Sequence, residues 1–587
     1  MNRNEETAAP KSPKFGEILK RMGKFISTLL TMLAVQLLGG TSFGQFSNPL
    51  FIPDTLLGPV LNMSLDEHEK QFFSGQVTQT KAFNNQAFLG PTLVLRRGWE
   101  VQVSLNYNLA DTTTLHWHGI HLSAHADGGP HSPILPNAQW NPHFTCLDKA
   151  GTYWYHPHFH GKTGKHTLQG AAGMIIVRDM EEGLLALPRR YGTDDFPVIV
   201  QCQEFDETNQ IKYKGSQDSI LLVNGTISPF LNVPAQVVRL RLLNSSNARN
   251  FNFGLPSNQT FYLIGTDGGL LGETLPVTRV KLAPGERAEI LVNLQGLEGQ
   301  IIRFKSYGSE IPQGTHGGPT LIGPTGSPNQ YSPLNGINFD VLEFRVGAQT
   351  ANPILTIQGT LVAQTRLTED QAINQRNIVF SAATQGSISG PYYMNDSTFN
   401  MERIDFRIPV NSIEIWNIQN QTVVAHPFHV HGFQFYILDR YGAPVGPEEL
   451  GRKDMILLSP NEQARIIIRF SDFADSLMPY MHHCHILTHE DEGMMGQFVV
   501  IPTPTGKAEP VSGKSLIFPN PVRDYLTISK LPFSMNSRVL ILNSQSRKVR
   551  EIRLTEDSSG LYIGDLDAGI YILKMEENTF FRFVKEN

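Results

Sequence analysis

A chain of 587 residues is too long for one hydrophobic core, and its length predicts about three to five domains. A hydrophobic content of 40% with 51 glycines and 37 prolines is typical of a globular chain rich in turns. The formal net charge of −6 is spread along the chain and gives no indication of a nucleic-acid partner.

The N-terminal segment is predicted to be an export signal. Basic residues precede the apolar run 25–38, and Ser42 and Gly44 place small side chains where a signal peptidase would cleave. The apolar run is short for a membrane-spanning helix, so residues 1–44 are expected to be removed as a signal peptide. No later segment is predicted to span a membrane, and the mature protein is expected to be exported.

Only three cysteines occur in the chain: Cys146, Cys202 and Cys484. An exported protein could join Cys146 to Cys202, but two small buried hydrophobic residues are the favoured interpretation. The sequence is therefore not that of a disulfide scaffold.

Strand patterns dominate the chain after the signal segment. Val101, Val103 and Leu105 alternate with polar residues, and the segment 238–242 alternates in the same way. Alternation with a period of two residues, interrupted by glycine, proline and asparagine, predicts short strands in β-sandwiches. Because no long helical pattern competes with it, the predicted fold class is all-β.

Two pairs of segments repeat along the chain. LHWHGIHL (115–122) resembles FHVHGFQF (428–435), and WYHPHFH (154–160) resembles MHHCHIL (481–487). Two copies of one sandwich, separated by a middle domain, account for this repeat. The predicted organisation is a signal peptide (1–44), a first domain (45–180), a middle domain (190–350), a third domain (351–502), a linker (503–514) and a small C-terminal domain (515–587).

Histidine is concentrated in two windows. All but two of the 19 histidines, His68 and His316, lie within residues 116–166 and 426–489. One His-x-His pair is usually incidental, whereas several pairs in repeated segments predict a metal site. The pairs are His116 and His118, His156 and His158, His429 and His431, His483 and His485.

Cys484 stands between His483 and His485 in the last of these pairs. Residues two apart on a strand point to the same face, and the middle residue points to the opposite face. The two imidazoles can therefore face one site while the thiol faces another. The peptide chain between them would be a short covalent path linking two metal centres.

The residue types around Cys484 predict copper. One thiolate, two imidazoles and a weak thioether form a blue-copper electron-transfer site, and Cys484, His489 and Met494 provide three of these ligands. His426 can provide the second imidazole. Zinc is the alternative, but structural zinc sites favour closed sets of four Cys and His ligands. The eight imidazoles of the His-x-His pairs, without carboxylates, suit a cluster of three copper ions.

These four histidine segments resemble the four copper-binding signatures of the three-domain multicopper oxidases, the family of laccases, cuprous oxidases and bilirubin oxidases. The resemblance extends over residues 46–503, and GPTLVLRRGWEVQV (90–103) is similar to the family's first-domain strands. It implies three cupredoxin-like β-barrel or sandwich domains, followed here by a small C-terminal β-sandwich. Pro157 stands where the third domain has Cys484, which implies that the first domain has no blue copper site.

The resemblance implies four copper ions: one type 1, one type 2 and two type 3. His426, Cys484 and His489 would hold the type 1 copper, with Met494 as its axial neighbour. His116 and His429 would hold the type 2 copper. Six imidazoles would hold the type 3 pair, those of His118, His156, His158, His431, His483 and His485.

An oxidoreductase with O2 as electron acceptor is the implied activity. Electrons from a reducing substrate would enter at the type 1 copper and pass inward through Cys484, and O2 would be reduced to water at the other three coppers. Asp127 and Glu490 match positions of proton-delivering acids in the bacterial branch of the family. A turn aspartate and a solvent-exposed glutamate are the alternative interpretations.

The reductant is less well defined by the sequence. Cuprous oxidases carry a methionine-rich insertion near the type 1 site, whereas residues 350–425 contain only Met394 and Met401. A laccase-like oxidase of phenols or aromatic amines is therefore favoured over a cuprous or ferrous metallo-oxidase in copper tolerance. A non-catalytic copper-binding surface protein is a third alternative, which the complete set of ligands disfavours.

The C-terminal segment carries a separate signature. FPNPVRDYLTIS (518–529) and DLDAGIYILKM (565–575) resemble the C-terminal sorting domain of type IX secretion substrates. The resemblance implies the type IX machinery as a partner and a protein that is secreted or held at the cell surface after crossing the outer membrane. A small β-sandwich for carbohydrate or surface attachment is the alternative.

Overall fold

The computed structural model describes residues 46–215, 217–320 and 332–503, and several segments nearer the C-terminus. Those segments are 516–518, 522–529, 538–543, 547–553, 560–575 and 580–586. The chain divides after Thr503 into two compact units, which are described separately. The predicted signal peptide and most of the predicted linker lie outside the described residues. In the described part of the chain, no helix is long and apolar enough to cross a membrane.

Two sheets enclose the core of the first domain. One has the strand order β2-β5-β11-β10-β7 and the other β4-β3-β6-β8, with β9 paired to β6. Val101, Val103 and Leu105 of β6 are buried, as their alternation predicts. The elements are β2 (Thr55–Leu57), β3 (Val60–Lys70), β4 (Thr78–Phe83), β5 (Thr92–Arg96), β6 (Glu100–Tyr107), β7 (His116–His118), α2 (Ala124–Asp127), β8 (Gln139–Trp140), β9 (His143–Thr145), β10 (Gly151–His156), α3 (Thr163–Leu168), β11 (Gly173–Arg178) and α4 (Met180–Gly183).

The middle domain has sheets of six and seven strands, in the orders β1-β15-β23-β22-β17-β20 and β14-β13-β12-β16-β21-β18-β19. Its strands are β1 (Asn48–Pro49), β12 (Asp195–Gln203), β13 (Ile220–Val223), β14 (Thr226–Ile227), β15 (Pro229–Pro234), β16 (Val237–Asn244), β17 (Phe251–Gly254), β18 (Phe261–Thr266), β19 (Gly269–Val277), β20 (Val280–Leu282), β21 (Arg287–Asn293), β22 (Ile301–Tyr307) and β23 (Asn338–Gly347). The 3-10 helices η1 (Pro256–Asn258) and η2 (Gly308–Glu310) lie between strands.

The third domain repeats the arrangement of the first. Its sheets have the orders β25-β24-β27-β32-β29-β30 and β26-β34-β33-β28-β31. The elements are η4 (Glu369–Gln371), β24 (Asn374–Ala382), β25 (Tyr392–Met394), β26 (Phe406–Pro409), β27 (Ser412–Asn420), β28 (His426–Val430), β29 (Phe435–Arg440), β30 (Ala443–Pro444), η5 (Pro447–Glu449), β31 (Met455–Leu458), β32 (Gln463–Phe470), β33 (Asp475–Cys484), α5 (Leu487–Asp491) and β34 (Met495–Ile501).

The C-terminal unit is a small two-sheet domain around its own apolar core. Its strand orders are β35-β36-β39 and β38-β37-β40-β41. The strands are β35 (Leu516–Phe518), β36 (Tyr525–Ser529), β37 (Arg538–Asn543), β38 (Lys548–Arg553), β39 (Gly560–Tyr562), β40 (Gly569–Met575) and β41 (Phe580–Lys585). The all-β prediction is confirmed in both units.

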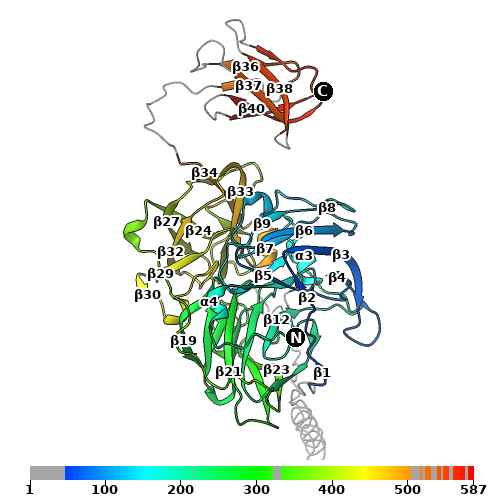
Figure 1. Cartoon of the computed structure of the whole chain (residues 1–587), viewed down its shortest axis with the longest axis vertical. Helices are drawn as coiled ribbons and strands as arrows, with labels where there is room; N and C mark the ends of the chain where they lie inside the picture. Colours follow the sequence, from blue (N-terminus) through cyan, green and yellow to red (C-terminus); the bar gives the residue numbers. More distant parts are fainter. Residues whose placement is uncertain are drawn as a thin grey trace, which may run out of the picture. The chain divides into compact units, whose positions relative to one another are not determined.

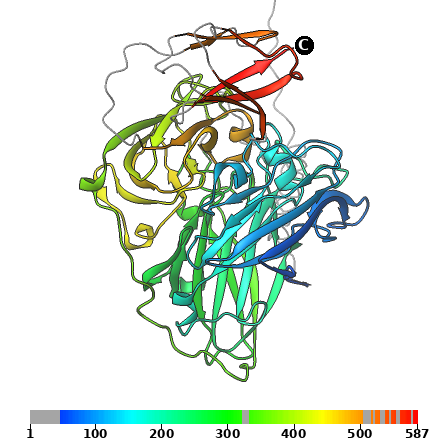
Figure 2. The same cartoon turned by 45° about the horizontal axis from the view of Figure 1, so that its top comes forward.

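The three larger domains pack against one another. Figure 1 shows the blue and cyan strands of the first domain beside the yellow and orange strands of the third, with the green middle domain against both, and Figure 2 shows the same neighbours. Phe88 and Trp154 of the first domain share one apolar cluster with Ile199 and Leu243 of the middle domain. Burial of such side chains stabilises the contact by about 1.5–3 kcal/mol each.

The arginines of β16 depart from the simple alternating pattern. Arg239 and Arg241 are fully buried rather than exposed. Arg241 donates to Asp195 at 2.7 Å, to Glu289 at 2.7 Å and to Thr152 of the first domain at 3.0 Å. The polar face of β16 is therefore covered by the first domain, which the sequence pattern could not indicate.

Replacing Arg241 with methionine is expected to lower the free energy of unfolding by about 3–5 kcal/mol, because it leaves buried carboxylates without their partner. Denaturant unfolding of the copper-free protein, followed by tryptophan fluorescence, measures the loss. Arg303→Met is the matched control: the Arg303 side chain is 36% exposed and pairs with Glu343. The control should cost at most about 1 kcal/mol. Equal losses in the two variants would contradict the assigned role of Arg241.

Candidate metal centres

The repeated histidine segments lie on paired strands at corresponding places in the first and third domains. In the first domain β7 pairs with the end of β10, with His116 opposite His156. In the third domain β28 pairs with the end of β33, with His429 opposite His483. The sequence repeat is thus one strand pair used twice, and the two pairs face each other across the contact between the domains.

Glycine follows two of the four His-x-His pairs, those ending at His118 and His431, for a steric reason. Gly119 and Gly432 have φ of 88° and 70°, in the left-handed region that disfavours other residues. A Cβ on Gly119 would lie 2.5 Å from Oδ2 of Asp454, and one on Gly432 would lie 2.6 Å from the ring of Tyr480. Glycine therefore lets the chain turn sharply where the two domains meet.

Three imidazoles converge closely in the centre of this contact. The Nε2 atoms of His158, His431 and His483 are each 3.1 Å from the other two. All three rings are buried, and burial lowers their pKa values well below the usual range, so they are neutral. Three neutral ring nitrogens at mutual hydrogen-bond distance cannot all be satisfied by one another. A metal ion would satisfy them together.

Other buried ring nitrogens have no hydrogen-bond partner within the described part of the chain. They include Nε2 of His116, Nε2 of His429 and both nitrogens of His485. Nδ1 of His116 donates to the backbone oxygen of Asp127 at 2.9 Å, and Nδ1 of His429 donates to that of Asp454 at 2.8 Å. Because a carbonyl oxygen only accepts, each Nε2 keeps its lone pair for a ligand bond.

The remaining imidazoles form a third group. Nδ1 of His118 lies 3.3 Å from Nε2 of His156, and the ring of His485 lies 4.9 and 5.4 Å from these two rings. His116 links these groups, because its ligand nitrogen lies within 4.8 Å of those of His118 and His156 and also of those of His429 and His431. The eight imidazoles therefore form one continuous buried cluster, and their division among type 2 and type 3 coppers stays a prediction from the sequence resemblance.

The thiol of Cys484 belongs to a separate group. Its Sγ lies 3.5 Å from Nδ1 of His426 and 3.7 Å from Nδ1 of His489. The hydroxyl of Thr422 lies 2.9 Å from Nε2 of His426 and so leaves Nδ1 of that ring to face the sulfur. Burial raises the pKa of the Cys484 thiol, so only a bound cation would hold it as the thiolate.

Met494 completes the surroundings of this thiol. Its side chain is fully buried in the same apolar cluster as Cys484. Its backbone N–H donates to His489 at 2.9 Å and its carbonyl accepts from Cys484 at 3.1 Å. The segment from α5 to β34 therefore fixes the three predicted ligands relative to one another.

Asp127 contacts the histidine cluster directly. Its Oδ2 accepts a hydrogen bond of 2.8 Å from Nδ1 of His431, and the carboxylate is buried. Gly128 ends α2 with φ of 76°, and a Cβ there would lie 1.7 Å from the backbone oxygen of Leu115. Only glycine fits this position, which holds Asp127 against the cluster.

Glu490 lies on the other side of the same imidazoles. Its carboxyl oxygens are 3.5 Å from Nδ1 of His158 and 3.3 Å from Nδ1 of His483. Only 1% of the residue is exposed, so it is not a solvated glutamate. Burial and the neighbouring Asp491 raise the pKa of Glu490 well above its usual range, so it holds a proton beside the cluster.

Two residues near these groups were missed by sequence reasoning. Asp454 lies 3.2 Å from Nε2 of His118 and forms a buried ion pair with Arg287 of the middle domain. Nδ1 of His482 lies 3.1 Å from the sulfur of Met394, and its ring stacks on Phe406. His482 thus fills the interior of the third domain. Asp454 stands outside the repeated segments, and His482 stands where the first-domain copy has Tyr155, so the repeat marks no role for either residue.

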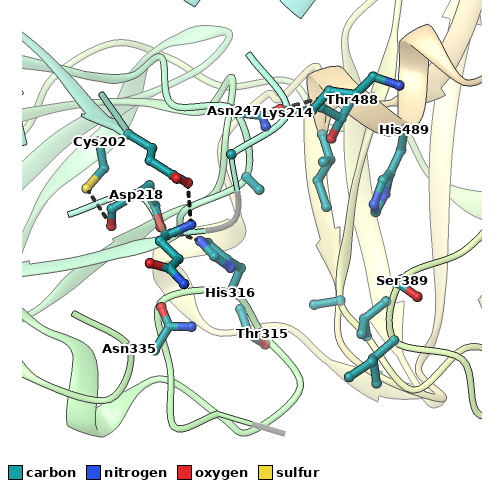
Figure 3. A pocket seen from close by; sticks show the side chains of 18 of the residues that line it. Cys202, Lys214, Asp218, Asn247, Thr315, His316, Asn335, Ser389, Thr488 and His489 are labelled. Carbon is teal, nitrogen blue, oxygen red and sulfur yellow. Dashed lines mark hydrogen bonds and ion pairs between the residues drawn. The ribbon is translucent and has the colours of Figure 1, made fainter. Parts of the chain in front are cut away.

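A cavity of about 680 Å³ opens beside the Cys484 group. It lies between the middle and third domains and is lined by Asp218, His316, Ser389 and His489, among others (Figure 3). His489 is partly exposed, whereas His426 and Cys484 are buried. A molecule in the cavity can therefore approach the group only through His489.

The site has two parts: a group of Cys, His and Met side chains, and a buried cluster of eight imidazoles. The backbone at Cys484 connects them directly. Together they define a copper redox protein of the cupredoxin type. The sequence profile of multicopper oxidases matches residues 67–182 and 366–504. A multicopper oxidase of Staphylococcus haemolyticus is 32% identical over 73% of this chain and 86% of its own length. The cell division protein FtsP of Xenorhabdus nematophila is 32% identical over 71% of this chain and 84% of its length.

Solved structures agree with these matches. A laccase-like multicopper oxidase, CueO from Ochrobactrum sp., has a TM-score of 0.68 and 30% identity, covering 77% of this chain and 100% of its own. McoA from Aquifex aeolicus has a TM-score of 0.68 and 31% identity, covering 77% and 99%. This chain belongs to the multicopper oxidase family, copper-dependent oxidoreductases that use O2 as acceptor.

The C-terminal unit matches a different profile. The description is a secretion system C-terminal sorting domain, and the match covers residues 516–585. The resemblance of the tail to a sorting domain is thereby confirmed, and it indicates export. Cys146 and Cys202 are both buried and unpaired, as the favoured interpretation predicts.

Proposed function

We propose that this multicopper oxidase holds four copper ions and oxidises phenols or aromatic amines. The cavity beside His489 carries the substrate part of the proposal. Its volume of about 680 Å³ lies in the range of sites for small organic ligands, about 300–1,000 Å³. Among the described residues, no methionine lines it. A dedicated Cu(I) site would be expected to offer such soft thioether ligands.

The proposed ligands are those that the resemblance implies. One copper is assigned to His426, Cys484 and His489 with Met494, one to His116 and His429, and two to His118, His156, His158, His431, His483 and His485. The unpartnered ring nitrogens and the buried thiol support this assignment. Bound copper would supply one-electron oxidation of the substrate at the Cys484 site and four-electron reduction of O2 at the histidine cluster.

Side chains and backbone groups of this chain orient the donors of the Cys484 group and of the histidine cluster. Backbone oxygens and Asp127 fix the tautomers of the histidines, which aims the lone pairs without further rearrangement. Glu490 holds a proton where O2 reduction consumes protons, and we assign it and Asp127 to proton delivery. Cys484 is bonded through the backbone to His483 and His485, so the two sites share a covalent connection while the substrate cavity stays separate from the buried cluster.

The similarity to the cell division protein FtsP raises a second candidate function, copper binding without oxidase activity. Sequestration of copper does not require a buried cluster of eight oriented imidazoles linked to a thiolate site. The complete set of donors in this chain therefore favours oxidase activity over a binding role.

Oxygen uptake tests the substrate class. The copper-loaded protein is supplied with 2,6-dimethoxyphenol, Cu(I) or Fe(II) at equal concentrations, and the phenol is expected to give the highest kcat/KM. A clear preference for Cu(I) or Fe(II) would assign the enzyme to metal oxidation instead. No oxygen uptake with any of them, with copper bound, would favour the binding role.

We further propose that the C-terminal domain directs the protein through the type IX machinery across the outer membrane, to be secreted or retained at the cell surface. The match of residues 516–585 to sorting domains supports this route. Removal of residues 515–587 should leave the oxidase in the periplasm, as detected by cell fractionation.

A further inference from the structure

The wall of the cavity opposite His489 carries a histidine–carboxylate pair that belongs to the middle domain. Nε2 of His316 lies 3.0 Å from Oδ1 of Asp218. Figure 3 shows His316 and His489 on opposite sides of the cavity. His316 is one of the two histidines outside the copper-binding windows, and the copper sites do not use it.

Asp218 is an ionised and fixed acceptor. Burial alone would raise its pKa, but His316 and Arg249 outweigh burial and hold the pKa of Asp218 below its usual range. Arg249 is fully buried and donates two hydrogen bonds of 2.7 Å, one to each carboxylate oxygen. An ionised carboxylate only accepts, so Nε2 of His316 is the protonated nitrogen. In the tautomer that donates from Nε2, Nδ1 carries the lone pair.

The His316 side chain is placed to meet a ligand. It is 25% exposed, while the Asp218 side chain behind it is 12% exposed. Within the described part of the chain, Nδ1 has no hydrogen-bond partner. The loop does not depend on the ring, because the backbone oxygen of His316 accepts from the backbone and side chain of Asn250 at 2.9 and 3.1 Å.

The other charged groups on this wall already have partners. Lys212 pairs with Glu204 at 2.5 Å, and Lys214 pairs with Glu492 at 3.0 Å. Tyr213 donates to Asp491. The titratable or charged side chains that line the cavity besides Asp218, His316 and His489 are those of Cys202, Glu204, Lys212, Tyr213, Lys214, Tyr392 and Glu492.

We propose that His316, oriented by Asp218, accepts the hydroxyl proton of a phenolic substrate while the substrate loses its electron. This inference rests on the proposed function. The O–H bond of the phenol would break, its proton would form an N–H bond with Nδ1 of His316, and the one electron would be taken up by the copper that His426, Cys484 and His489 would hold. A neutral phenoxyl radical leaves, and His316 returns the proton to solvent. Without a base, oxidation would produce a radical cation in a partly desolvated cavity, which is unfavourable.

Comparison of two reductants tests the role of His316. The copper-loaded His316→Gln variant is assayed with 2,6-dimethoxyphenol and with ferrocyanide, which loses an electron but no proton. We expect kcat/KM for the phenol to fall by about 10²-fold or more, with ferrocyanide turnover and the blue absorption unchanged. His68→Gln, the same change at the other histidine outside the copper-binding windows and away from the residues that line the cavity, is the control and should behave as wild type.

The outcomes separate the two proposals. Equal loss of phenol and ferrocyanide turnover, or unchanged phenol turnover, would overturn the role of His316. A wild-type enzyme that is blue and oxidises ferrocyanide but not the phenol would instead overturn the proposed substrate class. Binding of the phenol is measured separately through KM, which a role in proton acceptance should change less than kcat.

Discussion

Cys484→Ser is expected to lose the intense blue absorption of the copper-loaded protein and its turnover with every reductant. The sulfur lies 3.5 and 3.7 Å from the two imidazoles of its site, and the position is fully buried. A serine hydroxyl does not ionise at neutral pH and is a hard ligand, so it cannot replace a thiolate toward copper. Absorption spectra, copper content and oxygen uptake measure the result.

The loss should be confined to one site. The histidine cluster keeps all its donors in this variant, so the copper content should fall by one ion and no more. Cys146→Ser is the matched control, because Cys146 is also a buried free thiol but lies in the apolar core of the first domain. The control should remain blue. A blue band in Cys484→Ser, or its loss in the control, would refute the assignment of the thiolate site.

The sequence predicted which side chains meet at the Cys484 group because the signal there is local. His483, Cys484 and His485 are consecutive, and the two-residue period of a strand alone decides which faces their side chains take. His489 lies on the short helix α5, and Met494 directly precedes β34. Residue types and spacing therefore sufficed to predict that His426, Cys484 and His489 lie together, as they do, while their role as copper ligands stays a prediction. That the two repeated strand pairs face each other became visible only in the structure.

What the sequence could not indicate depends on contacts between distant segments. His118 meets Asp454 across 336 positions, and His316 meets Asp218 across 98. The burial of Arg241 likewise requires the first domain to cover β16. The period of a strand does not show which exposed face of a domain will be covered by another domain. Asp454, Asp218 and Arg241 therefore looked like ordinary polar side chains in the sequence.

The two acids beside the cluster differ in how a substitution should affect them. Asp127 accepts a hydrogen bond from His431, and an asparagine can still accept it through its side-chain oxygen. The pKa of Glu490 is raised by burial, which favours the protonated acid, and the role proposed for it is to deliver that proton. An amide of the same shape should therefore slow O2 reduction more at Glu490 than at Asp127. Asp127→Asn serves as the comparison for Glu490→Gln.

Glu490→Gln is expected to slow O2 reduction by about 10²–10⁴-fold, the usual contribution of a positioned general acid. Substrate oxidation at the Cys484 site should persist, so the blue colour should bleach on addition of reductant and return slowly when O2 is admitted. Stopped-flow absorption separates these two phases. Glu448→Gln, an exposed acid of the same domain, is the control and should leave both phases unchanged.

The same variant has a consequence for stability that does not depend on turnover. In the copper-free protein the pKa of Glu490 is raised above the ordinary 4.5, so the folded state loses stability as pH rises from 4.5 toward that higher pKa. Glutamine has no proton to lose, so Glu490→Gln should lack this part of the pH dependence and should be at least as stable as wild type near pH 7. If the variant instead unfolds more readily at every pH, Glu490 acts through packing, and a slower reaction with O2 could not be attributed to its proton.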